Sequence, residues 1–318
     1  MVPTFFGITL VTFAFLHLAP GDPVSMSMGD AAIGQGAISR EAIAHFRHTM
    51  GLDDPLPAQY AKWLWRIVRF DFGNGWRTGQ PVTQLLAQSL PVTLLLSSIA
   101  LFLSYAIAIP LGVHAAVKRD SPAEKLVTLL LFILYSLPVP FVAILIILLF
   151  GGGHFFNVLP IQGLHRDGFE SLAWPARIGD LVWHLIAPVF CLTYGSLASL
   201  SRYMRGAMLD VIRQDYIRTA RAKGLSERAV IFRHALRNSL LPLVTLLGLY
   251  LPFLVGGSVI VERIFGINGM GMLAFRAILE RDYNVIMGVT TLTALLTMVG
   301  VLVSDLLYAI VDPRIRHA

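Results

Sequence analysis

The sequence predicts an all-α membrane protein with six transmembrane helices, and its composition and its apolar stretches both support this fold class. Of the 318 residues, 56% are hydrophobic and 14% are charged, and the mean hydropathy is +0.69. Soluble domains carry about a quarter charged residues, so a lipid environment is expected. Six long stretches lack Asp, Glu, Lys and Arg, as a membrane-spanning helix of about 20 residues requires. Strands would need a closed barrel and a two-residue alternation, which these stretches lack.

The predicted spans follow one another along the chain as residues 1–21, 91–117, 126–150, 181–201, 238–261 and 283–304. Residues 1–19 are interpreted as a retained first span, because they lack the basic lead-in and the small-residue cleavage site of a signal peptide. A first span of this kind often follows a short basic segment, and its absence favours a natural start upstream of Met1.

The positions of Lys and Arg orient these spans. Short connections on one side of the membrane carry fourteen of these residues, and those on the other side carry five. The excess marks the cytoplasmic side, so both termini are expected in the cytoplasm. The chain then divides into a first helix (1–21), an extracytoplasmic loop (22–90), a core of five helices (91–312) and a cytoplasmic tail (313–318).

Several functional classes are excluded by what the sequence lacks. The net charge of +6 would fit a nucleic-acid-binding protein, but the basic residues lie between apolar runs, so no nucleic-acid partner is expected. The single cysteine, Cys191, excludes a disulfide framework and a cysteine metal cluster. No phosphate-binding Gly-x-x-x-x-Gly-Lys-Ser/Thr loop, Gly-x-Ser-x-Gly elbow or His-Glu-x-x-His pair occurs. We therefore expect no catalytic residue, metal or cofactor on this chain.

The long first external loop contains a predicted amphipathic helix over residues 56–70. Its apolar face is predicted to carry Tyr60, Leu64, Ile67 and Val68, with Lys62, Arg66 and Arg69 off that face. Two roles remain open for this helix. It serves either as a structural lid against membrane or protein, or as a contact surface for an external partner.

The most informative segment, residues 208–238, lies between the fourth and fifth spans and is called the 208–238 segment below. A helix is predicted over Tyr216–Lys223, ending at Gly224, because glycine readily adopts the left-handed conformation that stops a helix. Ser226 is predicted to cap a second helix that runs towards Pro242. Two short helices joined at a glycine would form a rigid cytoplasmic knob.

The sequence of this knob favours a contact with another protein. A charged loop can act only as a topology determinant, but small residues at Ala220, Ala222 and Gly224 would let another surface approach the backbone. The run Tyr-Ile-Arg-Thr-Ala-Arg-Ala-Lys-Gly-Leu, followed by His-Ala-Leu-Arg-Asn, resembles the EAA loop of the dipeptide, oligopeptide and nickel permease family of ABC importers. Matching motifs occur in order along nearly the whole chain, at residues 19–23, 71–73, 280–283 and 311–316.

The chain departs from the family pattern at three places. Arg218 and Thr219 stand where the general EAA motif has Glu and Ala, and Leu236-Arg237 replaces its Leu-Pro. The external turn at residues 267–271 lacks the Pro-Gly pair that is more common in the family. These differences concern individual contacts and leave the family resemblance in place.

The resemblance implies a type I ABC importer permease with a MetI-like architecture, in a bacterial inner membrane. It implies a second homologous permease subunit, two ATPase subunits that bind ATP and Mg, and an extracytoplasmic substrate-binding protein. The implied cargo is a peptide, with nickel chelates or glutathione as alternatives. The resemblance assigns contact with the ATPase to a coupling helix comprising Tyr216, Ile217, Arg218, Thr219, Ala220, Arg221, Ala222, Lys223, Gly224 and Leu225.

Other kinds of membrane protein fit the sequence less well. A secondary carrier would show internal repeats and acidic residues at mid-membrane, and neither is evident. A scaffold without a motor would have no reason to carry the coupling-loop pattern. Prolines in the spans can bend helices, either for packing alone or as hinges of a pathway that opens to alternate sides. The candidate hinges are Pro138, Pro188, Pro242 and Pro252.

Overall fold

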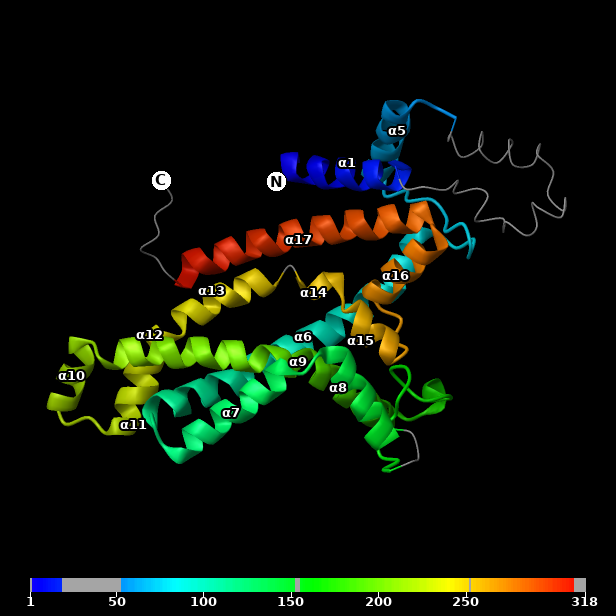
Figure 1. The fold of residues 1–318 in the computed structure, drawn as a ribbon. Coiled ribbons are helices and arrows are strands. Elements are labelled where there is room, and N and C mark those ends of the chain that lie inside the picture. The colour runs from blue at the N-terminus through cyan, green and yellow to red at the C-terminus, as the bar shows by residue number, and fades with distance from the viewer. Residues whose placement is uncertain (1, 19–52, 152–154, 252, 312–318) are drawn as a thin grey trace. The chain divides into compact units, whose positions relative to one another are not determined.

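The computed structural model describes residues 2–18, 53–151, 155–251 and 253–311 (Figure 1). Within these ranges, the regular elements are helices, apart from one isolated antiparallel bridge between Asn74 and Pro81. The predicted helical fold class is therefore confirmed. The chain packs as two units, the first formed by residues 1–93, 255–259 and 268–298 and the second by the remaining residues.

The first unit is built around the start of two long helices. Its helices are α1 (Val2–Leu18), α5 (Leu56–Val68), the first part of α6 (Val82–Val117), α16 (Met270–Glu280) and the first part of α17 (Tyr283–Val311). Val82 and Leu86 of α6 pack with Met270 of α16 and Val285 of α17 in one buried cluster. These apolar contacts fix the beginnings of the two long helices against α16.

Helix α5 confirms the predicted amphipathic helix, with one correction. The Tyr60 ring packs against Phe13 of α1 with centroids 5.3 Å apart, and its hydroxyl lies 2.9 Å from Thr9 Oγ1. Ile67 is also buried, and Trp63, three residues from Tyr60, stacks on it and extends the apolar face. The helix ends at Val68, two residues earlier than predicted, and Val68 itself is 72% exposed.

The second unit contains the middle of the chain. Its elements are α7 (Pro122–Ser136), α8 (Val139–Ile146), the π-helix η1 (Ile147–Gly151), the 3-10 helix η2 (Phe169–Ser171), α9 (Trp174–Ile212), α10 (Asp215–Ala222), α11 (Glu227–Ala229), the π-helix η3 (Val230–Ala235), α12 (Leu236–Ser239) and α13 (Leu241–Tyr250). The short helices α14 (Phe253–Gly256) and α15 (Val259–Ile264) contribute residues to both units, as do α6 and α17.

Two glycines let helices of the second unit approach closely. A Cβ atom built on Gly112 of α6 would lie 2.5 Å from Met204 Cβ of α9. A Cβ atom on Gly248 of α13 would collide with the Ser304 side chain of α17. At both positions glycine is required by the close packing of the neighbouring helix.

Among the described residues, three helices are long and apolar enough to cross a membrane, namely α6, α9 and α17 over Tyr283–Leu306. Two bent pairs raise the number to five if each pair is one span. These are Pro122–Ser136 with Val139–Gly151, bent by 96°, and Glu227–Ser239 with Leu241–Gly256, bent by 44°. The apolar helix α1 is shorter than these, so the first predicted span, residues 1–21, stays a prediction.

Candidate functional site

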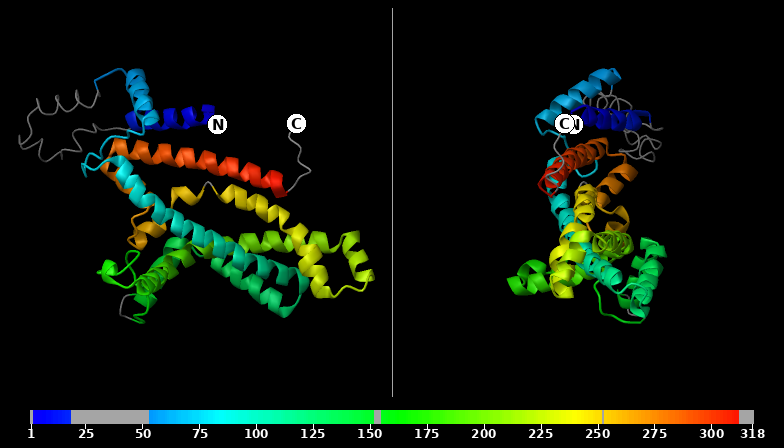
Figure 2. Two further views of the ribbon diagram at one scale, coloured as in Figure 1. Left: turned by 180° about the vertical axis from the view of Figure 1, so that it is seen from behind. Right: turned by 90° about the vertical axis from the view of Figure 1, so that its left-hand side faces the viewer.

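The 208–238 segment forms a compact turn at the end of α9, with α10 and α11 on either side of Gly224 (Figures 1 and 2). Helix α10 is anchored by two buried side chains, Ile217 and Ala220, which are 0% and 7% exposed. They belong to a core cluster with Met204 and Met208 of α9. The same cluster contains Val113 and Ala116 of α6, Val230, Ile231 and Ala235 of η3, and Leu243 of α13. The turn is therefore held rigidly on α6, α9 and α13.

Gly224 ends α10 as predicted, in the left-handed conformation with φ +76°. Its N–H donates to the Arg221 carbonyl at 2.9 Å, and the N–H of Leu225 donates to the Ala220 carbonyl at 3.4 Å. This pair of hydrogen bonds is a Schellman ending, which satisfies the last carbonyls of the helix. A Cβ atom built on Gly224 would have no atom within 4 Å, so the space above the turn is open.

An ion pair closes the turn between the two helices. Arg221 donates twice to Glu227, from Nη2 to Oε1 at 2.6 Å and from Nε to Oε2 at 3.1 Å. The Arg221 hydrogen bond lowers the pKa of Glu227. Ser226 Oγ accepts a hydrogen bond from the Ala229 N–H at 3.4 Å, which confirms the predicted cap.

The second helix of the segment differs from the predicted one. It is divided into α11, the π-helix η3 and α12, so its hydrogen bonds do not keep the α-helical spacing throughout. The burial of Val230, Ile231 and Ala235 shows that η3 turns its apolar side chains towards the core cluster. Asn238 Nδ2 donates to the Tyr216 hydroxyl at 2.7 Å, which joins α12 back to α10.

The predicted coupling residues divide into two groups by exposure. Ile217 and Ala220 face the core, so the expectation that Ala220 lets another surface approach was wrong. The other eight residues are exposed: Tyr216, Arg218, Thr219, Arg221, Ala222, Lys223, Gly224 and Leu225. Two of them are large and apolar, since Tyr216 is 41% and Leu225 is 42% exposed. The turn thus presents a rigid surface of mixed apolar and cationic character, suited to contact with a protein.

The candidate hinge prolines lie in different backbone environments. Pro138 stands at the 96° break between α7 and α8, and Pro242 lies in the first turn of α13, beside the 44° bend. Pro188 is buried within α9, which continues unbroken through it. Pro252 lies outside the described residues. Movement at any of these positions stays a prediction.

Comparison with known families decides the class of the protein. The family model described as binding-protein-dependent transport system inner membrane component matches residues 108–317. The model of the N-terminal part of this membrane component matches residues 2–97. The chain belongs to this family. Together with the apolar helices, membership makes this inner membrane component a multi-pass membrane protein.

Relatives of this inner membrane component align over nearly their whole length. The oligopeptide transport system permease protein AppB of Bacillus subtilis (strain 168) is 42% identical over 317 residues, which cover 99% of this chain and 96% of AppB. The dipeptide transport system permease protein DppB of Escherichia coli (strain K12) is 37% identical over 333 residues, covering 100% of this chain and 96% of DppB. The peptidoglycan transport system permease protein YejB of Agrobacterium fabrum is 33% identical over 346 residues, covering 99% of this chain and 95% of YejB.

A solved structure shares the fold of this inner membrane component. A chain of the MetNI methionine ABC transporter, in an inward-facing conformation and the CY5 native crystal form, matches with a TM-score of 0.55 at 18% identity. The match covers 72% of this chain and 97% of that chain. The shared fold agrees with the MetI-like architecture that the family resemblance implied.

The inner membrane component also contains a buried carboxylate that the sequence analysis did not single out. Asp282 is 4% exposed and accepts hydrogen bonds from the Trp76 N–H at 2.7 Å and from the Val285 N–H at 3.2 Å. Burial raises the pKa of Asp282. Its position directly before α17 was a signal for a helix cap, but the contact with the distant turn at Trp76 was not visible from the sequence.

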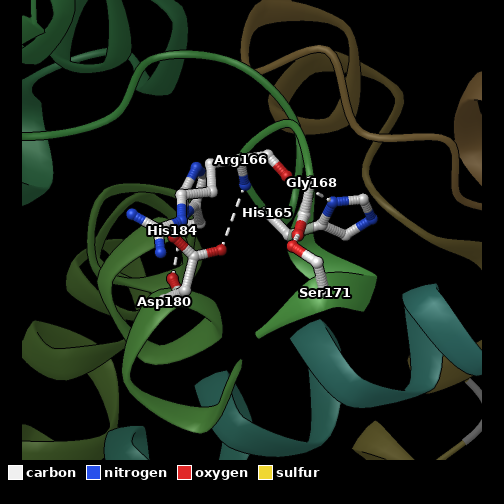
Figure 3. A network of polar contacts seen from close by, with 6 residues as sticks. All are labelled: His165, Arg166, Gly168, Ser171, Asp180 and His184. Carbon is white, nitrogen blue, oxygen red and sulfur yellow. Dashed lines mark hydrogen bonds and ion pairs between the residues drawn. The ribbon is translucent and has the colours of Figure 1, made fainter. Parts of the chain in front are cut away.

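A second polar network lies at the start of α9 (Figure 3). Asp180 Oδ2 accepts from the Arg166 N–H at 3.0 Å, and His184 Nδ1 lies 2.8 Å from the Asp180 carbonyl oxygen. The His165 ring stacks on Phe169 with centroids 4.6 Å apart. These contacts tie the loop before α9 to its first turns. Within the described ranges, no three His, Cys, Asp or Glu side chains gather to hold a metal ion.

Proposed function

We propose that this chain is the transmembrane permease subunit of an ATP-driven importer and forms half of a translocation pathway for peptides. The family match supports the importer class, and the relatives named for oligopeptide and dipeptide transport support the cargo. The proposal includes six spans, with α1 as the first, and both termini in the cytoplasm. The excess of Lys and Arg in the connections on one side supports that orientation.

The observation that carries the proposal is the exposed turn around Gly224 on a buried anchor. Ile217 and Ala220 pack against Met204 and Met208 of α9. A force applied to the exposed side of α10 would therefore reach α9, and α13 through Leu243 of the same cluster. A permease subunit driven by a separate ATPase needs such a contact between its docking surface and its long helices.

In the proposed cycle, an ATPase subunit docks on the exposed residues of the turn. ATP and Mg are bound by two such ATPase subunits, and a second homologous permease subunit completes the pathway. ATPase closure would displace α10 and tilt α9 and α13, so that access changes from inward to outward. The docked contacts must differ in free energy between the two states, since equal contacts would shift no equilibrium. An extracytoplasmic binding protein would then release its peptide into the opened pathway.

The test is co-purification of the complete transporter from mild detergent. The double variant Lys223→Glu, Leu225→Asp reverses one charge and removes one exposed apolar side chain, and it leaves Ile217 and Ala220 in place. We expect this variant to insert in the membrane and to lose the ATPase subunits. Lys125→Glu is the matched control, because Lys125 is exposed on α7 and predicted on the same side of the membrane. Retention of the ATPase by the double variant, with peptide uptake unchanged, would contradict the proposed docking.

The relative named for peptidoglycan transport favours peptidoglycan fragments as a second candidate cargo. Uptake of a labelled dipeptide, a labelled oligopeptide and a labelled peptidoglycan fragment by the intact transporter would separate these possibilities. A nickel chelate and glutathione complete the set, because the family resemblance left both open. The peptide proposal expects the dipeptide or the oligopeptide to be taken up fastest, and uptake of the nickel chelate alone would refute it.

A further inference from the structure

A cavity of about 250 Å³ lies between α6, α7 and α9 of the second unit. The coupling proposal does not use it. Its wall combines apolar side chains with two hydroxyls and two guanidinium groups, including those of Thr128, Leu131, Phe132, Ser201, Arg202 and Arg205. A second cavity of similar volume adjoins it and shares Phe132, Ala198 and Arg202 with it. Both arginines line the first cavity, which is called the recess below, and Arg202 also lines the second.

The charges around the recess are not balanced. Arg205 Nη2 lies 3.3 Å from Glu124 Oε1, which also accepts a hydrogen bond from Thr128 Oγ1 at 3.2 Å. Arg205 Nε is buried and has no hydrogen-bond partner among the described residues. Arg202 lies 4.7 Å from the Phe132 ring centroid, and none of the ion pairs in the described part of the chain includes it. The one buried carboxylate is thus paired with Arg205, while Arg202 has no carboxylate partner among the described ion pairs.

The recess lies where the apolar stretches of two helices end. On α9, the charge-free run 181–201 stops directly before Arg202, and on α7 the charge-free run 126–150 begins directly after Lys125. The neighbouring surface of α7 is apolar and open, since Leu126 is 57%, Leu129 is 56% and Leu130 is 51% exposed. A phospholipid site needs cationic groups for the headgroup phosphate and an apolar surface for the acyl chains, and the recess and the adjoining face of α7 provide both.

We propose that this recess binds the phosphate group of an anionic phospholipid, such as phosphatidylglycerol, in the cytoplasmic leaflet. Arg202 and Arg205 hold the phosphate by charge-assisted hydrogen bonds, and the acyl chains lie along Leu126, Leu129 and Leu130 of α7. The negative headgroup supplies the missing charge, whereas the ammonium group of a zwitterionic lipid would be repelled by the guanidinium groups. The choice of leaflet rests on the orientation given under Proposed function.

The test uses the complete transporter in mild detergent, titrated with phosphatidylglycerol or with phosphatidylethanolamine of the same acyl chains and read by native mass spectrometry. We expect phosphatidylglycerol to be retained preferentially, and Arg202→Gln to weaken its binding about tenfold, as the loss of one charge-assisted contact predicts. Arg119→Gln removes an exposed arginine outside the recess, and it should change binding by less than about twofold. The double variant Glu124→Gln, Arg205→Gln removes the buried ion pair without leaving a lone charge, and it should also weaken binding about tenfold.

Three results would overturn the proposal. Equal binding of the two lipids would show that charge does not select the ligand. Displacement of the lipid by inorganic phosphate at equal concentration would assign the recess to free anions. Displacement by a dipeptide would assign it to the transported cargo. Co-purification of the ATPase, measured on the same preparation, reports separately on the proposed function, so the two proposals fail independently.

Discussion

Two substitutions at Gly224 distinguish the effect of backbone strain from the effect of filling the open space above the turn. With φ at +76°, every residue other than glycine is strained there, by about 1–2 kcal/mol for most side chains and by less for Asn. No atom lies within 4 Å of the Cβ position, so crowding adds nothing within the chain itself. Gly224→Asn therefore fills the open space at little conformational cost, whereas Gly224→Val fills it and also strains the backbone.

We expect both variants to be inserted and folded, because about 1–2 kcal/mol is a small part of the stability of a domain. Both should lose the stimulation of ATPase activity by the peptide-loaded binding protein, since the added side chain occupies the surface on which the ATPase docks. The assay is ATP hydrolysis by the reconstituted transporter with and without loaded binding protein. Gly168→Asn is the matched control, because Gly168 has the same φ of +76° outside the 208–238 segment. Full stimulation in Gly224→Asn would refute the reasoning, and loss in Gly224→Val alone would show that only the backbone shape matters.

Three further predictions concern stability. Ile217→Ala should destabilise the turn by about 2–5 kcal/mol, because the side chain is fully buried, and thermal unfolding should show a lower midpoint than for the exposed control Thr219→Ala. A double-mutant cycle on Arg221→Ala and Glu227→Ala should give a coupling of about 0.2–1 kcal/mol that falls with added salt, since both side chains are largely exposed; a coupling that salt leaves unchanged would contradict this. Burial raises the pKa of Asp282 in the folded state above its unfolded value, so protonation of this carboxyl favours the folded state. The thermal unfolding midpoint of the parent chain should therefore rise relative to that of Asp282→Asn as the pH falls through the raised pKa. A difference that does not change with pH would rule out titration of this carboxyl.

Local signals predicted the turn at Gly224 well, because the helix stop and the Ser226 cap depend on a few neighbouring residues. The burial of Ala220 was not predictable in this way, since it depends on Met204 and Met208 of another helix. The same limit applies to Val68, whose spacing puts it on the face of Tyr60 and Leu64 but whose exposure depends on what lies opposite the end of α5. Contacts between residues far apart in the chain, such as that of Asp282 with Trp76, have no local signature.

The prolines show how well a single residue predicts a break in a helix. Pro138 restricts Leu137, which is extended with ψ at 125°, so the chain breaks between α7 and α8. Pro188 stands alone, and α9 continues through it because its neighbours keep the helix. Pro91, taken as the start of the second span, lies inside α6, which begins at Val82. The place of a proline relative to a helix end was therefore more informative than its presence, since Pro138 and Pro242 lie at breaks and Pro188 and Pro91 lie inside helices.

The contact between Gly248 and Ser304 has a consequence for how α13 and α17 respond to load. The Ser304 side chain of α17 occupies the space that a side chain at position 248 would need, so the two helices pack closely at this level. A displacement of α13 at this level would therefore press directly on Ser304, so α17 is the neighbour that would have to move with it.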